Sequence, residues 1–335
     1  MRGYPKWIAA AFVLIVAAIT PAAHATEEGR SLYLPGTYSD FSAGVFGPSG
    51  LYFRNDFFAY HGTLSKAPVG GRLFTDLDQR VWINAFKFSL VTDTEILGAR
   101  YGTGLSVPIV LYSWAEGFLE PGELRRQNDR TGLGDLYFAP LQLNWRWQDH
   151  HLTLSHGIFA PSGSYNRRRV MNLGRNHWGF DTRLAYTWLH GQRGHEFTVT
   201  AGYLINTRNH ATNYRSGDEV HLDYLIAQHL FECFGVGFTG YWYKQVTGDD
   251  SPVLNRLNLG SFRGEAAGIG VALLYRPTIG GRDLDIVFKW LHDVHAARRF
   301  QGSEIMLSVA LKFGSRAAAK TSTGFGPKVP NVAAD

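Results

Sequence analysis

The chain has 335 residues with a hydrophobic share of 45%, which excludes a disordered or collagen-like chain. The single cysteine, Cys233, excludes a disulfide framework and a cysteine-rich metal site. The formal net charge of +5 is modest, and the arginines lie in scattered clusters, so nothing points to nucleic acid as a partner. Glycine and aromatic residues are abundant, whereas charged residues are only 18%.

The first 25 residues have the pattern of a secretory signal. Arg2 and Lys6 form a basic start, residues 7–19 form an apolar run, and Ala23-His24-Ala25 fits the small-x-small cleavage rule. The alternative is an N-terminal membrane anchor, but this run is too short to cross about 30 Å of hydrocarbon as a helix. We therefore expect residues 1–25 to be cleaved and the protein to be exported.

The mature chain consists of segments in which apolar and polar residues alternate. The clearest is 304–313, where one face carries Ile305, Leu307, Val309, Leu311 and Phe313. An alternation with period two predicts a strand with one apolar face. The same pattern recurs in residues 181–188, 196–206, 219–226 and 284–291. Counting such segments predicts about twelve strands.

The connections between these segments alternate in length along the chain. Short turns are expected near residues 92–94, 149–150, 191–194, 232–233 and 277–282. Long polar loops are expected near 61–80, 113–132, 161–176, 207–217, 248–262 and 294–302. Short turns at one end and long loops at the other are typical of outer-membrane barrels.

Two architectures accommodate many alternating strands, a soluble β-sandwich and a membrane barrel. A sandwich core would bury several unpaired charges, which costs several kcal/mol per ion, whereas a wet barrel lumen would not. We therefore predict an all-β, transmembrane, antiparallel up-and-down β-barrel over residues 51–313, with both termini periplasmic. Residues 26–50 would be a periplasmic or lumen-plugging segment, and residues 314–335 a disordered tail. This predicts the outer membrane of a Gram-negative bacterium as the location.

The charged side chains on the inner faces of the strands are the first candidate site, and we expect them to line the solute pathway. They are Arg54, Asp56, Lys87, Asp181, Arg183, Glu219, His221, Asp223, Lys244 and Lys289. Mixed signs predict pairs across the lumen and selection of solutes by charge and size. The alternative is a sealed, salt-bridged interior that only holds the barrel together.

An aromatic segment before the first strand is the second candidate. Tyr33, Tyr38, Phe41 and Phe46 lie among glycines and prolines. Folded into the lumen, these rings would form a gate, since twelve strands enclose more room than the eight that side chains alone can fill. The alternative is a tail in the periplasm.

Arginine clusters mark three of the segments that we place outside the membrane. They are Arg125-Arg126, Arg167-Arg168-Arg169 and Arg298-Arg299. They predict contact with anionic lipopolysaccharide or a positively charged mouth. The alternative is ordinary solvated loops.

Signals for an enzyme are weak. His150-His151 lies in an expected turn without a third metal ligand, and Ser155-His156 has no orienting partner. A lipid hydrolase would need that serine and histidine to act together, although neighbouring strand residues face opposite sides. We therefore expect no catalytic residues, no metal and no cofactor.

Four stretches of the chain resemble the family of meta-pathway phenol-degradation proteins, also called SphA-like transporters. They are residues 34–41 with 48–56, Gly134-Asp-Leu-Tyr-Phe-Ala-Pro140, Asn172-Leu-Gly-Arg-Asn-His-Trp178, and 202–207 with 214–224. The resemblance covers about residues 33–313 and implies an outer-membrane barrel. One departure is the tail after Phe313, where barrel chains often end.

The resemblance and the residue pattern together predict a passive channel that admits small hydrophobic or aromatic compounds. Its partners would be that solute, outer-membrane lipid and lipopolysaccharide. A plugged structural or adhesive barrel without conduction and, less favoured, an outer-membrane lipid hydrolase are the alternatives.

Overall fold

The computed structural model describes residues 27–120, 124–231, 233–256 and 263–313. The expected signal segment, residues 1–25, and the expected C-terminal tail, residues 314–335, lie outside the described residues. Within the described ranges, no helix is both long enough and apolar enough to cross a membrane.

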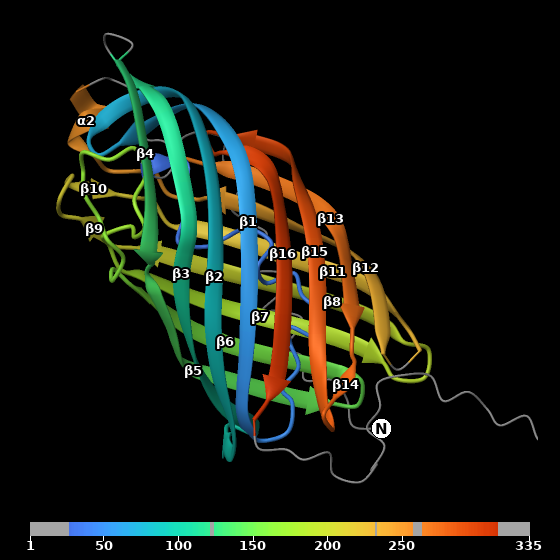
Figure 1. The fold of residues 1–335 in the computed structure, drawn as a ribbon. Helices are drawn as coiled ribbons and strands as arrows, with labels where there is room; N and C mark the ends of the chain where they lie inside the picture. Colours follow the sequence, from blue (N-terminus) through green and yellow to red (C-terminus); the bar gives the residue numbers. More distant parts are fainter. Residues whose placement is uncertain (1–26, 121–123, 232, 257–262, 314–335) are drawn as a thin grey trace, which may run out of the picture.

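The architecture is a closed antiparallel barrel of twelve strands within the described residues, as the sequence predicted (Figure 1). Neighbours along the chain pair with each other, and the sheet closes because β1 pairs with β16 and β13 pairs with β15. Closure satisfies every strand edge inside the membrane. The strands are β1 (Gly50–Val69), β2 (Arg72–Ile96), β3 (Ala99–Leu119), β5 (Leu136–Trp147), β6 (His150–Ala160), β7 (Gly179–His190), β8 (His195–Asn206), β11 (Glu219–Leu230), β12 (Phe234–Gln245), β13 (Glu265–Tyr275), β15 (Arg282–Ala297) and β16 (Gln301–Lys312).

Six smaller elements of the described residues lie outside the twelve barrel strands. The strand β4 (Leu124–Leu133) pairs only with the outer part of β3. The others are η1 (Glu27–Gly29), β9 (Arg208–Asn209), β10 (Tyr214–Arg215), α2 (Pro252–Arg256) and β14 (Thr278–Ile279).

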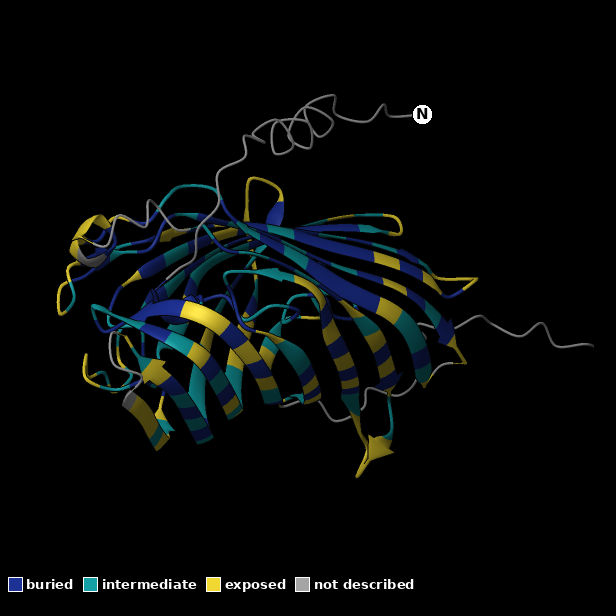
Figure 2. Ribbon diagram, turned by 90° about the horizontal axis from the view of Figure 1, so that it is seen from above, coloured by how far each residue is buried: buried dark blue, intermediate teal, exposed yellow. Residues whose placement is uncertain are grey.

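Apolar side chains face outward and polar ones inward, as the alternation predicts. In β16, Ile305 and Leu307 are each 43% exposed on the outer face, whereas Glu304 and Ser308 are buried on the inner face. Figure 2 shows this banding of buried and exposed positions along many strands. An apolar outer surface around a closed sheet is suited to lipid.

Short turns at one end of the barrel identify its periplasmic end. The first of them lies at Leu97-Gly98 and not at residues 92–94, which belong to β2. Leu97 and Gly98 both have positive φ values, 54° and 72°, as a tight two-residue hairpin turn requires. The expected turns near 191–194 and 277–282 connect strands as predicted, whereas the one near 232–233 includes residue 232, which lies outside the described residues.

The opposite end corrects the prediction of long loops at 61–80, 113–132 and 294–302. Strands β1 and β2 continue to a tight turn at Gly70-Gly71, whose φ values are 58° and 76°. Likewise β3 and β4 continue through most of 113–132, and β15 through residue 297. These strand ends extend past the lipid-facing band, where the outer face of a strand carries polar residues, so their composition resembles that of a loop.

Candidate functional site in the barrel lumen

The N-terminal segment, residues 27–49, contacts the inner side of the barrel along much of its length. At the outer end, Glu28 accepts hydrogen bonds from Asn172, at 2.9 Å, and from Arg175, at 2.7 Å. Glu27 accepts one from Asn209 at 2.9 Å. These donors lie in the connections after β6 and β8, so the described segment begins beside the outer loops and not at the periplasmic end, where the sequence analysis placed the N-terminus.

The two tyrosines of this segment lie against inward-facing charged groups. Tyr33 donates a hydrogen bond to Asp223 at 2.9 Å, and its ring is stacked on His221 with 4.0 Å between centroids. The guanidinium of Arg183 lies 3.9 Å from the centroid of the Tyr38 ring, a cation–π contact. The aromatic rings therefore bind to the wall of the lumen.

The two phenylalanines lie nearer the periplasmic end. Phe41 packs edge-on against His229, with 5.7 Å between centroids. Arg100, at the start of β3, donates hydrogen bonds to the carbonyl oxygens of Phe46 and Gly47, at 3.1 Å and 2.6 Å. The segment thus runs from the outer loops to the periplasmic end, where β1 begins.

One group of inward charges lies on β1, β2 and β15. Asp56 pairs with Arg54 at 2.5 Å and with Lys87 at 2.6 Å, and Arg54 also pairs with Asp40 of the N-terminal segment. Lys289 is fully buried and donates to the carbonyl oxygens of Gly36 and Ser39, at 2.8 Å and 3.2 Å. These basic groups anchor the segment to one side of the lumen.

A second group lies on β7 and β11. His221 lies 3.0 Å from Asp181 and 3.5 Å from Asp223, and Arg183 lies 3.3 Å from Asp181. Glu219 accepts a hydrogen bond from Asn206 at 3.0 Å and another from Ser31 of the N-terminal segment. Among the described residues, the ion pairs of both groups join nearby residues of the wall or join the wall to the N-terminal segment. They do not form the pairs across the lumen that the sequence analysis expected.

The inward placement of Lys244 is wrong. In β12 the inward positions are Tyr241, Tyr243 and Gln245, so Lys244 faces outward and pairs with Glu265 of the next strand at 3.3 Å. The error arises because Lys244 lies near the outer end of β12, where a charged side chain no longer contacts hydrocarbon.

Replacing Arg54 by methionine should lower the free energy of unfolding by roughly 1–3 kcal/mol, because Asp40 and Asp56 would lose a charged partner in a partly buried site. The midpoint of urea unfolding in detergent measures it. Arg276→Met is the matched control, since its partner Asp285 is half exposed and such pairs contribute about 0–1 kcal/mol. Equal losses in the two variants would contradict the anchoring role of Arg54.

A cavity of about 250 Å³ lies between the N-terminal segment and the wall formed by β1, β2 and β3. Strand register arranges its wall in layers. An apolar layer consists of the directly paired Phe58, Ile83 and Val110. Toward the periplasm it is followed by Asp56, Ala85 and Pro108, and toward the outside by Tyr60, Val81 and Ser113.

Buried polar atoms line the outer layer of the cavity. Ser113 Oγ and Glu304 Oε1 are buried and have no hydrogen-bond partner in the part of the chain that the structure describes. Gln79, 4% exposed, lies one layer further out on β2. The cavity therefore has an apolar layer with hydrogen-bonding groups on its outer side, while Lys87 and Ser106 line its periplasmic side.

The barrel wall is interrupted next to this cavity. Strand β4 ends at Leu133, the residues Gly134-Asp135 leave the sheet, and β5 then pairs with β6. Beside β4 lies the connection of residues 161–178, whose backbone donates to Asn128 and Asp135. Side-chain hydrogen bonds thus replace strand pairing along this edge of β4.

Sequence reasoning missed the cavity wall. Phe58, Ile83 and Val110 are apolar residues on the inner face, whereas the barrel rule places polar residues there. The alternation along β2 could have shown which of its residues face inward, because Trp82 and Phe88 lie on the outer face and are 49% and 37% exposed. Ile83 lies on the opposite, inner face.

The positions of the remaining candidates decide between the interpretations given for the Ser155-His156 pair and for the arginine clusters. Ser155 is buried on the inner face of β6, whereas His156 contacts Thr182 on the outer face, so the two cannot act together. Among the described residues, no group of three or more His, Cys, Asp or Glu could hold a metal ion. Arg299 turns inward, 3.8 Å from the Tyr243 ring centroid, whereas Arg126, Arg167 and Arg168 are exposed.

Comparisons with known proteins agree with this architecture. The COG4313 outer membrane channel from Pseudomonas putida F1 aligns with a TM-score of 0.62 and 15% identity, over 84% of this chain and 100% of that one. A FadL homologue from Pseudomonas aeruginosa aligns with a TM-score of 0.39 and 10% identity, over 88% and 99% of the two chains. The first likeness shows the fold of a Gram-negative outer-membrane barrel.

No curated protein matches the chain. A family model described as "Putative MetA-pathway of phenol degradation" matches residues 65–309, most of the chain. The chain therefore belongs to this phenol-degradation family.

Proposed function

We propose that this barrel is a passive channel that admits small hydrophobic or aromatic compounds through the outer membrane. The cavity behind the N-terminal segment carries this proposal. Its volume of about 250 Å³ exceeds the roughly 150 Å³ that suffices to bind benzene in an engineered protein cavity. Its Phe58–Ile83–Val110 layer suits an aromatic ring, and Ser113 and Gln79 can bind a polar substituent.

The proposed path has three steps. A solute is captured at the outer loops, enters the cavity, and then passes the N-terminal segment toward the periplasm. The connection of residues 161–178 offers a second route, because its movement away from β4 would open the cavity through the side of the barrel wall. Diffusion supplies the driving force, and no cofactor is needed. The phenol-degradation family and the channel fold support this assignment.

A plugged structural barrel is the second candidate, and the contacts of the N-terminal segment favour it. Tyr33, Asp40 and Glu28 tie that segment to the wall at three levels. Such a segment would block hydrophilic solutes but leave the cavity accessible. The two candidates therefore differ in the uptake of hydrophobic compounds, and not in the conductance of ions.

Uptake of a radiolabelled monocyclic aromatic compound should fall in cells that lack this protein and return on complementation. Purified protein in liposomes should pass sugars poorly, because the N-terminal segment occupies the lumen. Equal aromatic uptake by parent and deletion cells would remove the transport proposal and leave the plugged barrel.

A further inference from the structure

Four arginines from three separate segments lie together at the outer end of the barrel. They are Arg72 of β2, Arg126 of β4, and Arg167 and Arg168 of the connection after β6. Arg72 donates a hydrogen bond to the carbonyl oxygen of Arg168 at 3.2 Å, and the charges of the other three act on it. Among the described residues, none of the four forms an ion pair with a carboxylate.

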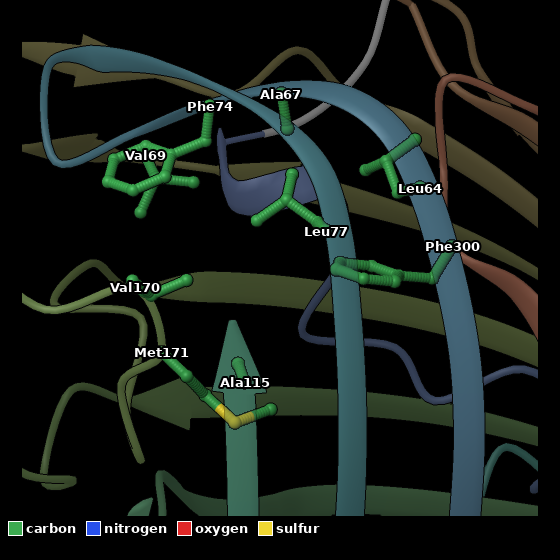
Figure 3. Packing of buried hydrophobic residues seen from close by; sticks show 9 residues of the cluster. All are labelled: Leu64, Ala67, Val69, Phe74, Leu77, Ala115, Val170, Met171 and Phe300. Carbon is green, nitrogen blue, oxygen red and sulfur yellow. The ribbon is translucent and has the colours of Figure 1, made fainter. Parts of the chain in front are cut away.

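Apolar packing brings these like charges together. The outer ends of β1 and β2 form a hairpin that belongs to the same buried cluster as Val170 and Met171 of the connection (Figure 3). Val69 and Phe74 belong to the hairpin part of this cluster and are almost fully buried. Arg72 lies between these two side chains in the sequence, so this packing fixes its position.

Backbone contacts fix the other arginines. A Cβ atom on Gly70 would lie 1.8 Å from the carbonyl oxygen of Arg167, so only glycine allows the hairpin tip this close. Asn128, on the same face of β4 as Arg126, accepts hydrogen bonds from the amides of Val170 and Met171, at 2.8 Å and 3.0 Å. The four basic groups are therefore held close together although they repel each other.

The chemistry that satisfies such a group is a multivalent anion. A guanidinium binds phosphate through two parallel hydrogen bonds, which makes arginine the preferred residue for phosphate recognition. The site lies at the end opposite the short periplasmic turns, so it faces the outer leaflet. Phosphorylated lipid is the abundant polyanion at that surface.

We propose that Arg72, Arg126, Arg167 and Arg168 form a binding site for the phosphate groups of lipopolysaccharide in the outer leaflet. Bound phosphate offsets the repulsion between the arginines and holds the β1–β2 hairpin against the connection of residues 161–178. None of the four arginines lines the cavity, so this proposal does not rest on the proposed transport.

The test measures binding of fluorescent deep-rough lipopolysaccharide to the purified full-length protein in detergent. The triple variant R126Q/R167Q/R168Q should bind at least about tenfold more weakly, since it loses three charge-assisted phosphate contacts. The matched control R146Q/R193Q/R282Q removes the same charge from exposed positions at the periplasmic end and should change affinity less than about twofold. Arg72 is retained because it contacts Arg168.

Two further measurements distinguish lipopolysaccharide phosphate from free phosphate as the bound anion. Lipopolysaccharide stripped of its phosphates should bind the parent protein as weakly as the intact form binds the triple variant. Millimolar inorganic phosphate should compete poorly; if it displaces the lipid completely, the site takes free phosphate and the lipid assignment fails. The charge-preserving R126K/R167K/R168K variant should regain part of the affinity. Equal weakening by both arginine triples, or by neither, overturns the proposal, and an unchanged heat-induced gel shift shows that each variant is folded.

Discussion

Deleting residues 30–46 should raise the single-channel conductance of the barrel on the order of tenfold, because this segment occupies much of the space that twelve strands enclose. The inward charges that remain, Asp56 with Lys87 and Asp181 with Arg183, would then line a continuous wet pore. Planar-bilayer recordings of the parent and deleted proteins measure the change. Liposome swelling with small sugars should rise in parallel.

Charge reversal provides the control for this pore. In the deleted protein, replacing Arg183 and Lys289 by glutamate should shift ion preference from anions toward cations, whereas the same replacement of the outward-facing Lys244 should not. An unchanged conductance after the deletion, in a protein that keeps its heat-induced gel shift, would show that the N-terminal segment does not occlude the lumen.

The membrane-facing part of the fold could be predicted because lipid imposes a strict alternation there. Residues 304–313 and 284–291 match β16 and β15 for this reason, and the strand number follows from counting such segments. Outside the lipid, the outer face of a strand meets water and no longer needs apolar residues, so the strict alternation disappears. This is why the extensions of β1 and β2 beyond residue 61 have the composition of a loop, and why Lys244 was assigned to the wrong face.

The candidate site was only partly accessible to sequence reasoning. Charged residues such as Asp181 and Lys289 stand out on inner faces because an ion cannot face lipid. Apolar residues such as Ile83 carry no such signal, since they are allowed on either face. Their role depends on what lies opposite them, and the contact between strand β2 and the N-terminal segment joins parts of the chain that no local pattern relates.

Replacing Ile83 by tryptophan should reduce uptake of a monocyclic aromatic compound at least about tenfold, because the larger ring would fill much of the apolar layer between Phe58 and Val110. The measurement is initial uptake of the radiolabelled compound by deletion cells that express each variant at equal level. The inward position of Ile83 makes the change specific to the cavity.

Ile305→Trp is the matched control, because it introduces the same side chain on the outer face of β16. Ile305 is 43% exposed there, and tryptophan is well tolerated in contact with lipid. It should leave uptake within about twofold of the parent protein. If Ile83→Trp transports like Ile305→Trp while both fold, the solute does not pass through this cavity. Transport would then have to use a path on the other side of the N-terminal segment, beside the Asp181 and His221 group.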